Sequence, residues 1–541
     1  MSKKRLFALA LLFALLFIAI LLKLGLLSLI RGEALSARAE AQQTRTVCYN
    51  QYDRGDICDR NGQNMTNVKE AALVLFLTMV TDDEQAAQKI SELLDLSADK
   101  TAYFINCARN EGRQTLVLKT GLSEGDCAKV DDLPAGAYIL PLYSRYPTLG
   151  TAVHLLGSVA RSQDGLYHGT AGLELLYDEY LQNRGGQKIA ALVDERGRMI
   201  TESGFRLIGG QQEKDMRLLL TIDKTYQEIL ERALAPYSGA AVLMSAQTGE
   251  ILACASSPAY DPYYWQNSDQ KQVYFNKVFG QYPPASIFKV LLTAAALEEK
   301  LPLKEDFFCD GSYILPNGHA VHCHKRSGHG IEDLQKALAN SCNPYFLDLA
   351  LRLGGDTIKS YTEKFAITEQ RVIGYSAASG QSLDFNSAVA ADIANVAIGE
   401  KGVRLSPVQV AQLLSVVANG GMSVKPRLVM GFSNSNGEYI SSIKQESPQR
   451  VISQETADKV CELLFYAANE GTGKNASAAT VAIGGKTGTS QNKGVWFAGF
   501  APAENPRWVL AVYIDNGSAG GKEGAAVFAE TISGVADLAG V

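Results

Sequence analysis

Basic runs, internal repeats and densely spaced cysteines are all missing from this chain of 541 residues. Its 51 Lys and Arg against 57 Asp and Glu give a net charge of −6, with no long basic run beyond the N-terminus. Nucleic-acid-binding proteins usually carry a basic face, so the charge balance disfavours that class. Nine cysteines are too few for a small disulfide scaffold. A hydrophobic fraction of 46 % with 20 % charged residues instead indicates a globular protein of two or three folded units.

A second long apolar run is also absent, and the first lies at the N-terminus. Leu6 to Leu22 is unbroken, Lys23 interrupts it, and Leu24 to Ile30 resumes it. Crossing a bilayer takes about 20 apolar residues, which this stretch supplies if Lys23 extends to the interface. The basic stretch Met1 to Arg5 favours a cytoplasmic N-terminus.

We therefore predict that residues 1–31 form a cytoplasmic tip and an uncleaved, single-pass anchor in the cell membrane. The rest of the chain would be extracytoplasmic. A cleaved signal peptide is the alternative, because Ala37-Arg38-Ala39 has the small-x-small form of a cleavage site. That site lies well beyond the apolar run, which is itself long for a signal peptide.

The chain after the anchor divides into two regions that differ in their pattern of apolar and charged residues. Residues 32–215 mix strand-like runs such as Ala72 to Val80 with charged helical pieces such as Asp82 to Leu96, which predicts an α+β module. The polar stretch Gln211 to Asp215 marks the predicted boundary. Residues 216–541 then form a second domain.

Apolar strand runs lie at both ends of residues 216–541, and the middle is helical. The strands are expected at Leu218–Ile222, Ala240–Ser245, Ile251–Ala255, Thr480–Ile483, Val495–Phe500 and Trp508–Ile514, with a helix at Lys224–Leu234. Strands at both ends imply one sheet assembled from both termini of a single domain. The turn-rich stretch Gly431 to Tyr439 predicts a surface loop.

Ser286 opens a run that is apolar almost all round, as far as Leu297, directly after Pro283-Pro284. Such a run predicts a helix buried within a domain. Lys289 lies on the same face of its first turn as Ser286. Burial disfavours the ammonium form, so Lys289 could act as a general base on a nucleophilic Ser286. The free N–H groups at the helix N-terminus could hold an oxyanion there.

The spacing Ser-x-x-Lys is weak evidence alone. It recurs, without a buried helix behind a Pro-Pro break, at Ser97, Ser268, Ser441 and Ser490. Two further elements strengthen it, because Ser341-Cys342-Asn343 precedes an apolar run and Lys486-Thr487-Gly488-Thr489 follows a predicted strand. Ser-x-x-Lys, an element of the Ser-x-Asn type and Lys-Thr-Gly are together the signature of penicillin-binding proteins and class A β-lactamases.

The chain resembles the class B penicillin-binding proteins, the monofunctional D,D-transpeptidases that cross-link peptidoglycan. Further motifs similar to that family occur at Arg54–Gly62, Tyr146–Gly157, Gly169–Glu174, Leu220–Asp223, Thr248–Ala253 and Gly328–Gly330. The chain departs from the family at Ala285, where Gly commonly precedes the serine, and at Ser245-Ala246, where an acidic residue is frequent.

The resemblance implies an α+β multidomain fold. Residues 1–31 would hold a transmembrane helix and residues 32–215 a non-catalytic pedestal domain of the dimerisation type. Residues 216–541 would form a serine β-lactamase/transpeptidase-like catalytic domain, with a central antiparallel sheet flanked by helices.

The resemblance also implies acyl transfer in cell-wall synthesis. Ser286 would attack the penultimate D-Ala of a stem peptide with Lys289 as base. Ser341, hydrogen-bonded between Lys289 and Lys486, would relay the proton to the leaving D-Ala. The other family positions would bind substrate: Asn343 its backbone, Lys486 as a fixed positive charge, Thr487 and Thr489 its carboxylate, and Gly488 by letting the strand approach closely. β-Lactams would bind the same site. The family needs no metal or organic cofactor, and a polytopic glycosyltransferase of the wall-synthesis complex is the implied partner.

Cysteines and histidines gather in one stretch of the catalytic domain. Cys309 and Cys323 bracket a segment, and the four histidines in and around it are His319, His322, His324 and His329. A zinc site is one interpretation, but the spacing fits no familiar ligand set. A disulfide between Cys309 and Cys323 is favoured in an oxidising compartment, whereas in an anaerobe the pair could stay reduced. Cys342 is expected to pack as a small apolar residue.

Three other functions share some of these features. A membrane-anchored β-lactamase would need a fast deacylating base, and the pedestal is foreign to it. A β-lactam sensor would normally carry further spans and a signalling module, and no H-E-x-x-H motif occurs. A non-catalytic scaffold of the wall-synthesis complex would not need the intact Ser286 and Lys289. Division, elongation and sporulation enzymes share these motifs, so the sequence leaves the physiological role open.

Overall fold

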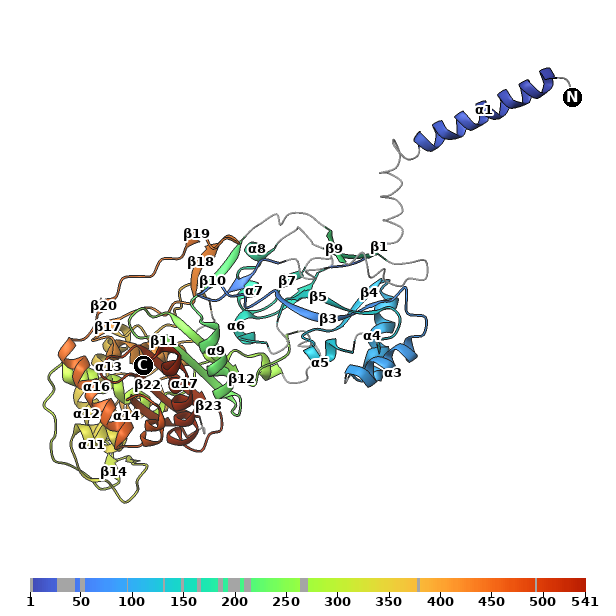
Figure 1. The fold of residues 1–541 in the computed structure, drawn as a ribbon. Coiled ribbons are helices and arrows are strands. Elements are labelled where there is room, and N and C mark those ends of the chain that lie inside the picture. Colours follow the sequence, from blue (N-terminus) through green and yellow to red (C-terminus); the bar gives the residue numbers. More distant parts are fainter. Residues whose placement is uncertain are drawn as a thin grey trace. The chain divides into compact units, whose positions relative to one another are not determined.

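The computed structural model describes residues 3–26, 44–48, 54–94, 96–129, 132–146, 150–162, 167–182, 188–192, 205–208, 216–262, 271–376, 380–491 and 494–541 (Figure 1). Contacts divide the chain into two compact units. Unit 1 comprises Met1–Asp53, Lys69–Thr148 and Arg184–Glu213, and unit 2 comprises Arg54–Val68, Leu149–Asn183 and Lys214–Val541. The predicted boundary at 211–215, residues 27–31 of the predicted anchor and residues 147–149 of one pedestal motif lie outside the described residues.

Unit 1 contains a three-stranded sheet of order β4-β3-β5 that packs with two helices. These elements are β3 (Val68–Phe76), β4 (Thr115–Lys119), β5 (Ala137–Ser144), α3 (Asp83–Leu94) and α4 (Ala98–Asn110). Alternate β3 residues Leu73 and Leu75 pack with Ile90 and Ile105 of the helices in one core cluster. The α+β character predicted for this region is therefore confirmed, although β3 begins and ends closer to the N-terminus than the predicted strand.

The other described elements of unit 1 are α1 (Lys3–Gly25), α5 (Glu124–Cys127), and β1 (Thr44–Cys48), β8 (Lys188–Leu192) and β9 (Phe205–Ile208), which form a second sheet. Within the described residues, no helix combines the length and the apolar character that crossing a membrane requires.

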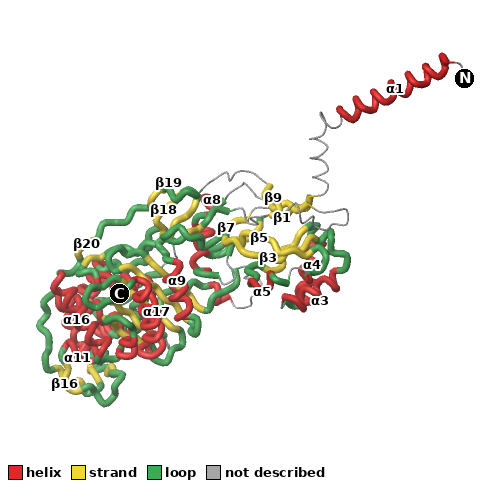
Figure 2. Tube along the Cα trace, viewed as in Figure 1, coloured by secondary structure: helices red, strands yellow, loops and turns green. Residues whose placement is uncertain are grey.

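A five-stranded antiparallel sheet of order β12-β11-β23-β22-β21 forms the centre of unit 2 (Figures 1 and 2). Its strands are β11 (Gly239–Ser245), β12 (Ile251–Ser257), β21 (Gly484–Thr489), β22 (Val495–Ala501) and β23 (Trp508–Ile514). The predicted assembly from both ends of the domain is confirmed. The strand predicted at Thr480–Ile483 is wrong, because the Lys-Thr-Gly motif itself forms β21.

Helices cover this sheet. Alternate strand residues pack with α9 (Lys224–Leu234) and α17 (Ala525–Ala539) in one hydrophobic cluster. Helix α15 (Pro407–Ala418) contacts β11, β22 and β23 through residues outside that cluster, which places it over the opposite face. Helix α16 (Gln454–Asn469) packs against β21. Since β21 ends the strand order, one side of it has no strand partner among the described residues.

A second, mixed sheet explains why unit 2 includes chain from before the predicted boundary. Strand β2 (Ile57–Cys58) runs parallel to β10 (Arg217–Leu220), which pairs antiparallel with β18 (Val429–Ser433). The strand predicted near 218 is thus present but lies outside the central sheet. The loop predicted at 431–439 is partly wrong, because β18 pairs with β19 (Tyr439–Ser442) in a hairpin.

The buried Arg54 also ties early segments into unit 2. Its guanidinium lies 2.9 Å from the Glu174 carboxylate, with the two side chains 1 % and 0 % exposed. Unit 2 also contains α6 (Val153–Leu156), β6 (Val159–Arg161), β7 (Tyr167–Gly169), α7 (Gly172–Leu176), α8 (Asp178–Leu181), η5 (Lys271–Tyr274), η6 (Lys277–Phe279), α13 (Gly355–Lys364), β17 (Met422–Ser423), β20 (Gln449–Arg450) and η8 (Lys474–Ala478).

Candidate active site

Ser286 lies on a short 3₁₀ turn, η7 (Ala285–Phe288), that leads into α10 (Lys289–Glu298). The helix therefore begins three residues after its predicted start, and its residues as far as Ala296 are buried as predicted. Ala285 has φ +48°, in the left-handed region that costs a residue with a Cβ about 1–2 kcal/mol. Glycine adopts this conformation freely, so the departure from the family at Ala285 introduces backbone strain directly before Ser286.

The central sheet holds the turn that carries Ser286. The indole Nε1 of Trp496 on β22 donates a 2.9 Å hydrogen bond to the Pro283 carbonyl. The ring of Tyr282 stacks on Tyr513 of β23, with centroids 3.9 Å apart. These contacts connect the segment before Ser286 to two neighbouring strands, so the position of the serine follows from the sheet.

The Lys289 ammonium joins the first two motifs. The side chain is 0 % exposed, and its Nζ donates to the Ser341 carbonyl at 2.9 Å, to Ser341 Oγ at 3.4 Å and to Asn343 Oδ1 at 2.7 Å. Burial lowers the pKa of Lys289 to about 8, against an opposing effect of Cys342 and Cys323. A neutral Lys289 is therefore accessible near physiological pH, which suits the predicted general base.

The second motif lies between two helices. Helix α11 (Leu334–Ala339) ends before Ser341, which has φ +56°, and Asn343 is the first residue of α12 (Asn343–Leu353). The positive φ turns the chain so that both the carbonyl and the hydroxyl of Ser341 meet Lys289. The Asn343 amide also donates to the His322 carbonyl at 3.3 Å.

Strand β21 carries the third motif. Lys486 is 1 % exposed, and burial followed by the charge of Lys289 lowers its pKa. Its Nζ donates to the Thr487 carbonyl at 3.1 Å, whereas the sequence-based expectation had Ser341 bonded between both lysines. A Cβ at Gly488 would lie 3.0 Å from the Pro284 carbonyl, so the close approach expected of this glycine is to the turn before Ser286.

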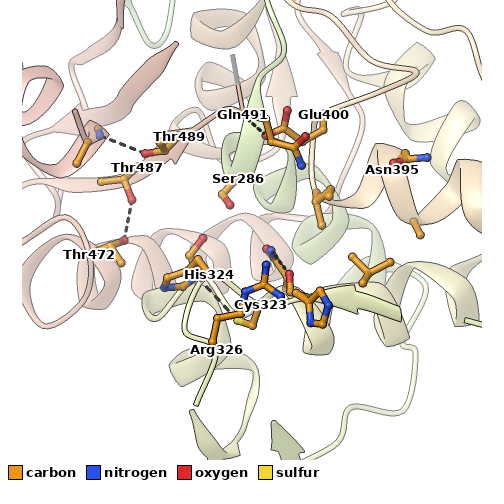
Figure 3. Close-up of a pocket in the computed structure, with 18 of the residues that line it drawn as sticks. Ser286, Cys323, His324, Arg326, Asn395, Glu400, Thr472, Thr487, Thr489 and Gln491 are labelled. Carbon is orange, nitrogen blue, oxygen red and sulfur yellow. Dashed lines mark hydrogen bonds between the residues drawn. The ribbon is translucent and has the colours of Figure 1, made fainter. Parts of the chain in front are cut away.

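A cleft of about 1140 Å³ opens in front of Ser286 (Figure 3). The predicted site residues that line it are Ser286, Ser341, Asn343, Thr487 and Thr489. In Figure 3 the two threonines lie to one side of Ser286, and His324 and Cys323 lie below it. Lys289 and Lys486 are buried behind these lining residues.

Sequence reasoning missed part of the cleft wall. Thr472 shares a 2.7 Å hydrogen bond between hydroxyls with Thr487, and Gln491 N–H donates to Glu400 at 3.0 Å. Burial raises the pKa of Glu400. Helix α14 (Ala390–Ala397) and the π-helical turn η9 (Gly520–Gly524) contribute further lining residues. No spacing pattern marked these residues, because they come from separate segments that only the fold brings together.

The predicted disulfide between Cys309 and Cys323 is not formed in this structure. Both cysteines are buried, free thiols. They belong to a wider group that also contains His329 and Cys342, so each of the two thiols has other ligand-type side chains nearby besides its predicted partner.

Comparison with known proteins identifies two family domains in this chain. The family "Penicillin binding protein transpeptidase domain" matches residues 239–533, and "Penicillin-binding Protein dimerisation domain" matches residues 50–212. Stage V sporulation protein D of Bacillus subtilis is 30 % identical over 95 % of this chain and 82 % of its own length. Peptidoglycan D,D-transpeptidase MrdA of Acinetobacter baumannii is 26 % identical over 86 % of this chain and 78 % of its own length.

Solved structures agree with the fold. A D,D-transpeptidase domain from Eggerthella lenta has a TM-score of 0.60 at 24 % identity, covering 74 % of this chain and 96 % of that chain. Penicillin-binding protein A of M. tuberculosis, solved as an imipenem acyl-enzyme complex, has a TM-score of 0.55 at 27 % identity, covering 59 % of this chain and 80 % of that chain. With its ordered motifs, its dimerisation domain and its transpeptidase fold, this chain belongs to the class B penicillin-binding proteins.

Proposed function

We propose that this chain is a serine-type peptidoglycan D,D-transpeptidase that cross-links stem peptides through an acyl-enzyme at Ser286. The observation that carries the proposal is the set of hydrogen bonds from the buried Lys289 ammonium to Ser341 and Asn343, two residues that line one cleft with Ser286. Family membership supplies the reaction class, which is acyl transfer in cell-wall synthesis.

Acylation uses the first two motifs. Ser286 Oγ attacks the carbonyl carbon of the penultimate D-Ala, and neutral Lys289 accepts the hydroxyl proton. Because burial lowers the pKa of Lys289 to about 8, its neutral form is populated near physiological pH. Ser341 relays a proton from Lys289 to the nitrogen of the departing terminal D-Ala. An amine from a neighbouring stem peptide then attacks the ester carbonyl, which forms the cross-link and releases Ser286.

Substrate binding uses the third motif and the edge of the sheet. Thr487 and Thr489 bind the substrate carboxylate through their hydroxyls, with Lys486 supplying positive charge behind them, and Asn343 holds the peptide backbone. The N–H groups of Ser286 and Thr489 stabilise the oxyanion by about 3–4 kcal/mol per donor. The side of β21 that has no strand partner among the described residues suits an extended peptide, because an edge strand offers backbone groups for pairing.

Intact mass spectrometry of the full chain in detergent with benzylpenicillin tests the proposal. We expect a stable adduct of one penicillin per chain in the wild type and none in Ser286→Ala. Ser441→Ala is the matched control, because Ser441 opens another Ser-x-x-Lys sequence but lies exposed on β19. This control should acylate like the wild type.

The alternatives give different results in the same experiment. A membrane-anchored β-lactamase would lose the adduct within seconds and consume penicillin catalytically. A non-catalytic scaffold would give no adduct from a folded chain. A β-lactam sensor would form a stable adduct but would not cross-link stem peptides in an assay with a pentapeptide donor and an amine acceptor.

The membrane anchor and the domain boundaries are part of the proposal. Large apolar side chains of α1, such as Phe13 and Phe17, are exposed along the helix, and burial in lipid would remove them from water. We propose a single span within residues 1–31 with the N-terminus cytoplasmic, a pedestal at 32–215 and an extracytoplasmic catalytic domain at 216–541. Protease added outside spheroplasts should degrade the catalytic domain, and deletion of residues 1–31 should release the chain from the membrane fraction.

A polytopic glycosyltransferase is the proposed partner, on the resemblance to class B enzymes. It would contact the anchor and the pedestal. Cross-linking in the membrane should capture such a protein with the full chain and lose it when residues 1–31 are deleted, whereas Ser286→Ala should leave the capture unchanged.

A further inference from the structure

Four side chains that bind metals well converge beside the cleft, and the proposed transpeptidation uses none of them. They are Cys309, Cys323, His329 and Cys342, and their ligand atoms all lie within 4.8 Å of one another. The three cysteines are 1 %, 2 % and 0 % exposed, His329 is half-buried, and all three thiols are free. Hydrophobic packing alone gives no reason to gather three thiols and an imidazole at one point.

The distances fit a tetrahedral metal site. Zinc lies about 2.3 Å from thiolate sulfur and about 2.0–2.1 Å from imidazole nitrogen, so a tetrahedral sulfur–nitrogen edge is about 3.5–3.6 Å long. His329 Nδ1 lies 3.7 Å from Cys309 Sγ and 3.6 Å from Cys323 Sγ. The distances from His329 Nδ1 to the Cys309 and Cys323 sulfurs therefore match two edges of a tetrahedral site.

We propose that Cys309, Cys323, His329 and Cys342 bind one zinc ion in a closed Cys₃His site. Thiolate and imidazole ligands favour zinc over the oxygen-binding ions Mg²⁺ and Ca²⁺. Four protein ligands leave no position for a reactive water, so the ion has a structural role. The sequence pointed instead to a disulfide because the ligands are spread over 34 positions, from 309 to 342, with no familiar spacing.

The segment that supplies the ligands has little else to hold it together. Three of the ligands lie in or next to strands of only three residues each: β13 (Phe307–Cys309), β15 (Ala320–His322) and β16 (Gly330–Glu332). Among the described strands, β15 pairs only with the equally short β14 (Ser312–Ile314). Isolated two-stranded ribbons are marginally stable in water. Three of their large apolar side chains point outward, with Phe308 69 %, Ile314 62 % and Ile331 62 % exposed, whereas Phe307 packs against Tyr345. The buried Cys–His cluster therefore occupies the place of a hydrophobic core in this segment.

The fourth ligand connects this segment to the proposed active site. Cys342 directly precedes α12 and stands between Ser341 and Asn343, whose oxygens accept the hydrogen bonds from Lys289. A metal bound to Cys342 would fix the main chain of both residues, a positioning role that rests on the proposed transpeptidase function. The metal site itself does not depend on that function.

Metal analysis of the full chain, purified in detergent without oxygen and without a metal-affinity tag, tests the proposal. We expect about one zinc per chain in the wild type. Cys309→Ser and His329→Ala should retain less than a tenth of it, whereas Cys461→Ser, at a half-buried thiol on α16, should retain all of it. His329→Cys should still bind zinc, because Cys₄ is also a closed zinc set. Exchange with cobalt should give the intense visible spectrum of tetrahedral cobalt with thiolate charge transfer.

Several results would overturn the site. These are a wild type without zinc, bound iron in place of zinc, a disulfide among the three cysteines after anaerobic purification, or equal zinc in Cys309→Ser and Cys461→Ser. The positioning role has a separate readout. Removing zinc with a chelator should slow benzylpenicillin acylation at least tenfold, and adding zinc back should restore the rate. Unchanged acylation by the metal-free chain would refute the positioning role but not the metal site. A chain that binds zinc but never acylates would refute the proposed function and leave the metal site intact.

Discussion

Backbone strain before Ser286 makes Ala285→Gly an unusual substitution. Replacing a buried alanine by glycine normally destabilises a protein, because a methyl group leaves the core and the unfolded chain gains freedom. Loss of the buried methyl costs about 0.8 kcal/mol, and the extra freedom of glycine costs about 0.4–1 kcal/mol. At φ +48°, however, glycine also relieves about 1–2 kcal/mol of strain. The unfolding free energy of Ala285→Gly should therefore lie within about 1 kcal/mol of the wild type.

Ala294→Gly is the matched control. Ala294 is 0 % exposed in the middle of α10, where the backbone is helical and glycine relieves no strain. The same substitution there should cost about 2 kcal/mol, from the lost methyl and the poor helix propensity of glycine.

Urea unfolding of the full chain, followed by tryptophan emission, measures both variants. Trp496 and Trp508, two of the chain's three tryptophans, lie buried in the central sheet of unit 2, so the signal reports on the domain that holds both sites. Equal destabilisation by the two substitutions would refute the argument that Ala285 is strained.

Three further outcomes follow from buried polar groups. Lys289→Met should slow benzylpenicillin acylation by about 10²–10⁴-fold, and stopped-flow acylation at the wild-type rate would exclude the general base. Burial raises the pKa of Glu231 to about 7, so the folded chain binds a proton that the unfolded chain releases above pH about 4.5. Stability should therefore fall as the pH rises from about 4.5 to 7, by at most about 3–4 kcal/mol, and urea unfolding of Glu231→Gln should lack this fall. Arg54→Met should lower the unfolding free energy by about 3–5 kcal/mol, because it leaves the buried Glu174 carboxylate without its positively charged partner. Adding Glu174→Leu should restore much of the lost stability.

Local patterns in the sequence predicted the elements whose determinants are themselves local. Helix α9 has the bounds that were predicted, because the Asp223 side chain caps it by accepting from Thr225 N–H and Tyr226 N–H. Strands β11 and β12 also lie where the apolar runs predict them, and they pair in a hairpin around a turn containing Gly249, which has φ +71°. The order of the three motifs then placed the candidate active site.

Elements that depend on distant contacts were not predictable in the same way. Strand β21 reads Gly-Gly-Lys-Thr-Gly-Thr and lacks apolar alternation, so the apolar pattern predicts a strand at the neighbouring Thr480–Ile483 instead. Its extended form comes from pairing with β22 and from close packing at Gly488. The cysteine cluster is a second case, because its ligands meet only after two short ribbons and a helix start have been brought together.

The geometry of the proposed active site depends on contacts different from those that hold the domain together. Ala285 and Ser341 both adopt left-handed conformations that alanine and serine disfavour, and each adjoins or forms part of a motif. Polar contacts maintain them, since Ala285 N–H donates to the Gly399 carbonyl at 3.0 Å and Ser341 accepts from Lys289. The central sheet, by contrast, is stabilised by apolar burial on both faces. Because the two sets of contacts are separate, a change such as Ala285→Gly can relieve backbone strain beside Ser286 while it leaves the unfolding free energy nearly constant. Ala294→Gly, by contrast, removes a methyl group from the core without relieving strain, so it should lower the unfolding free energy.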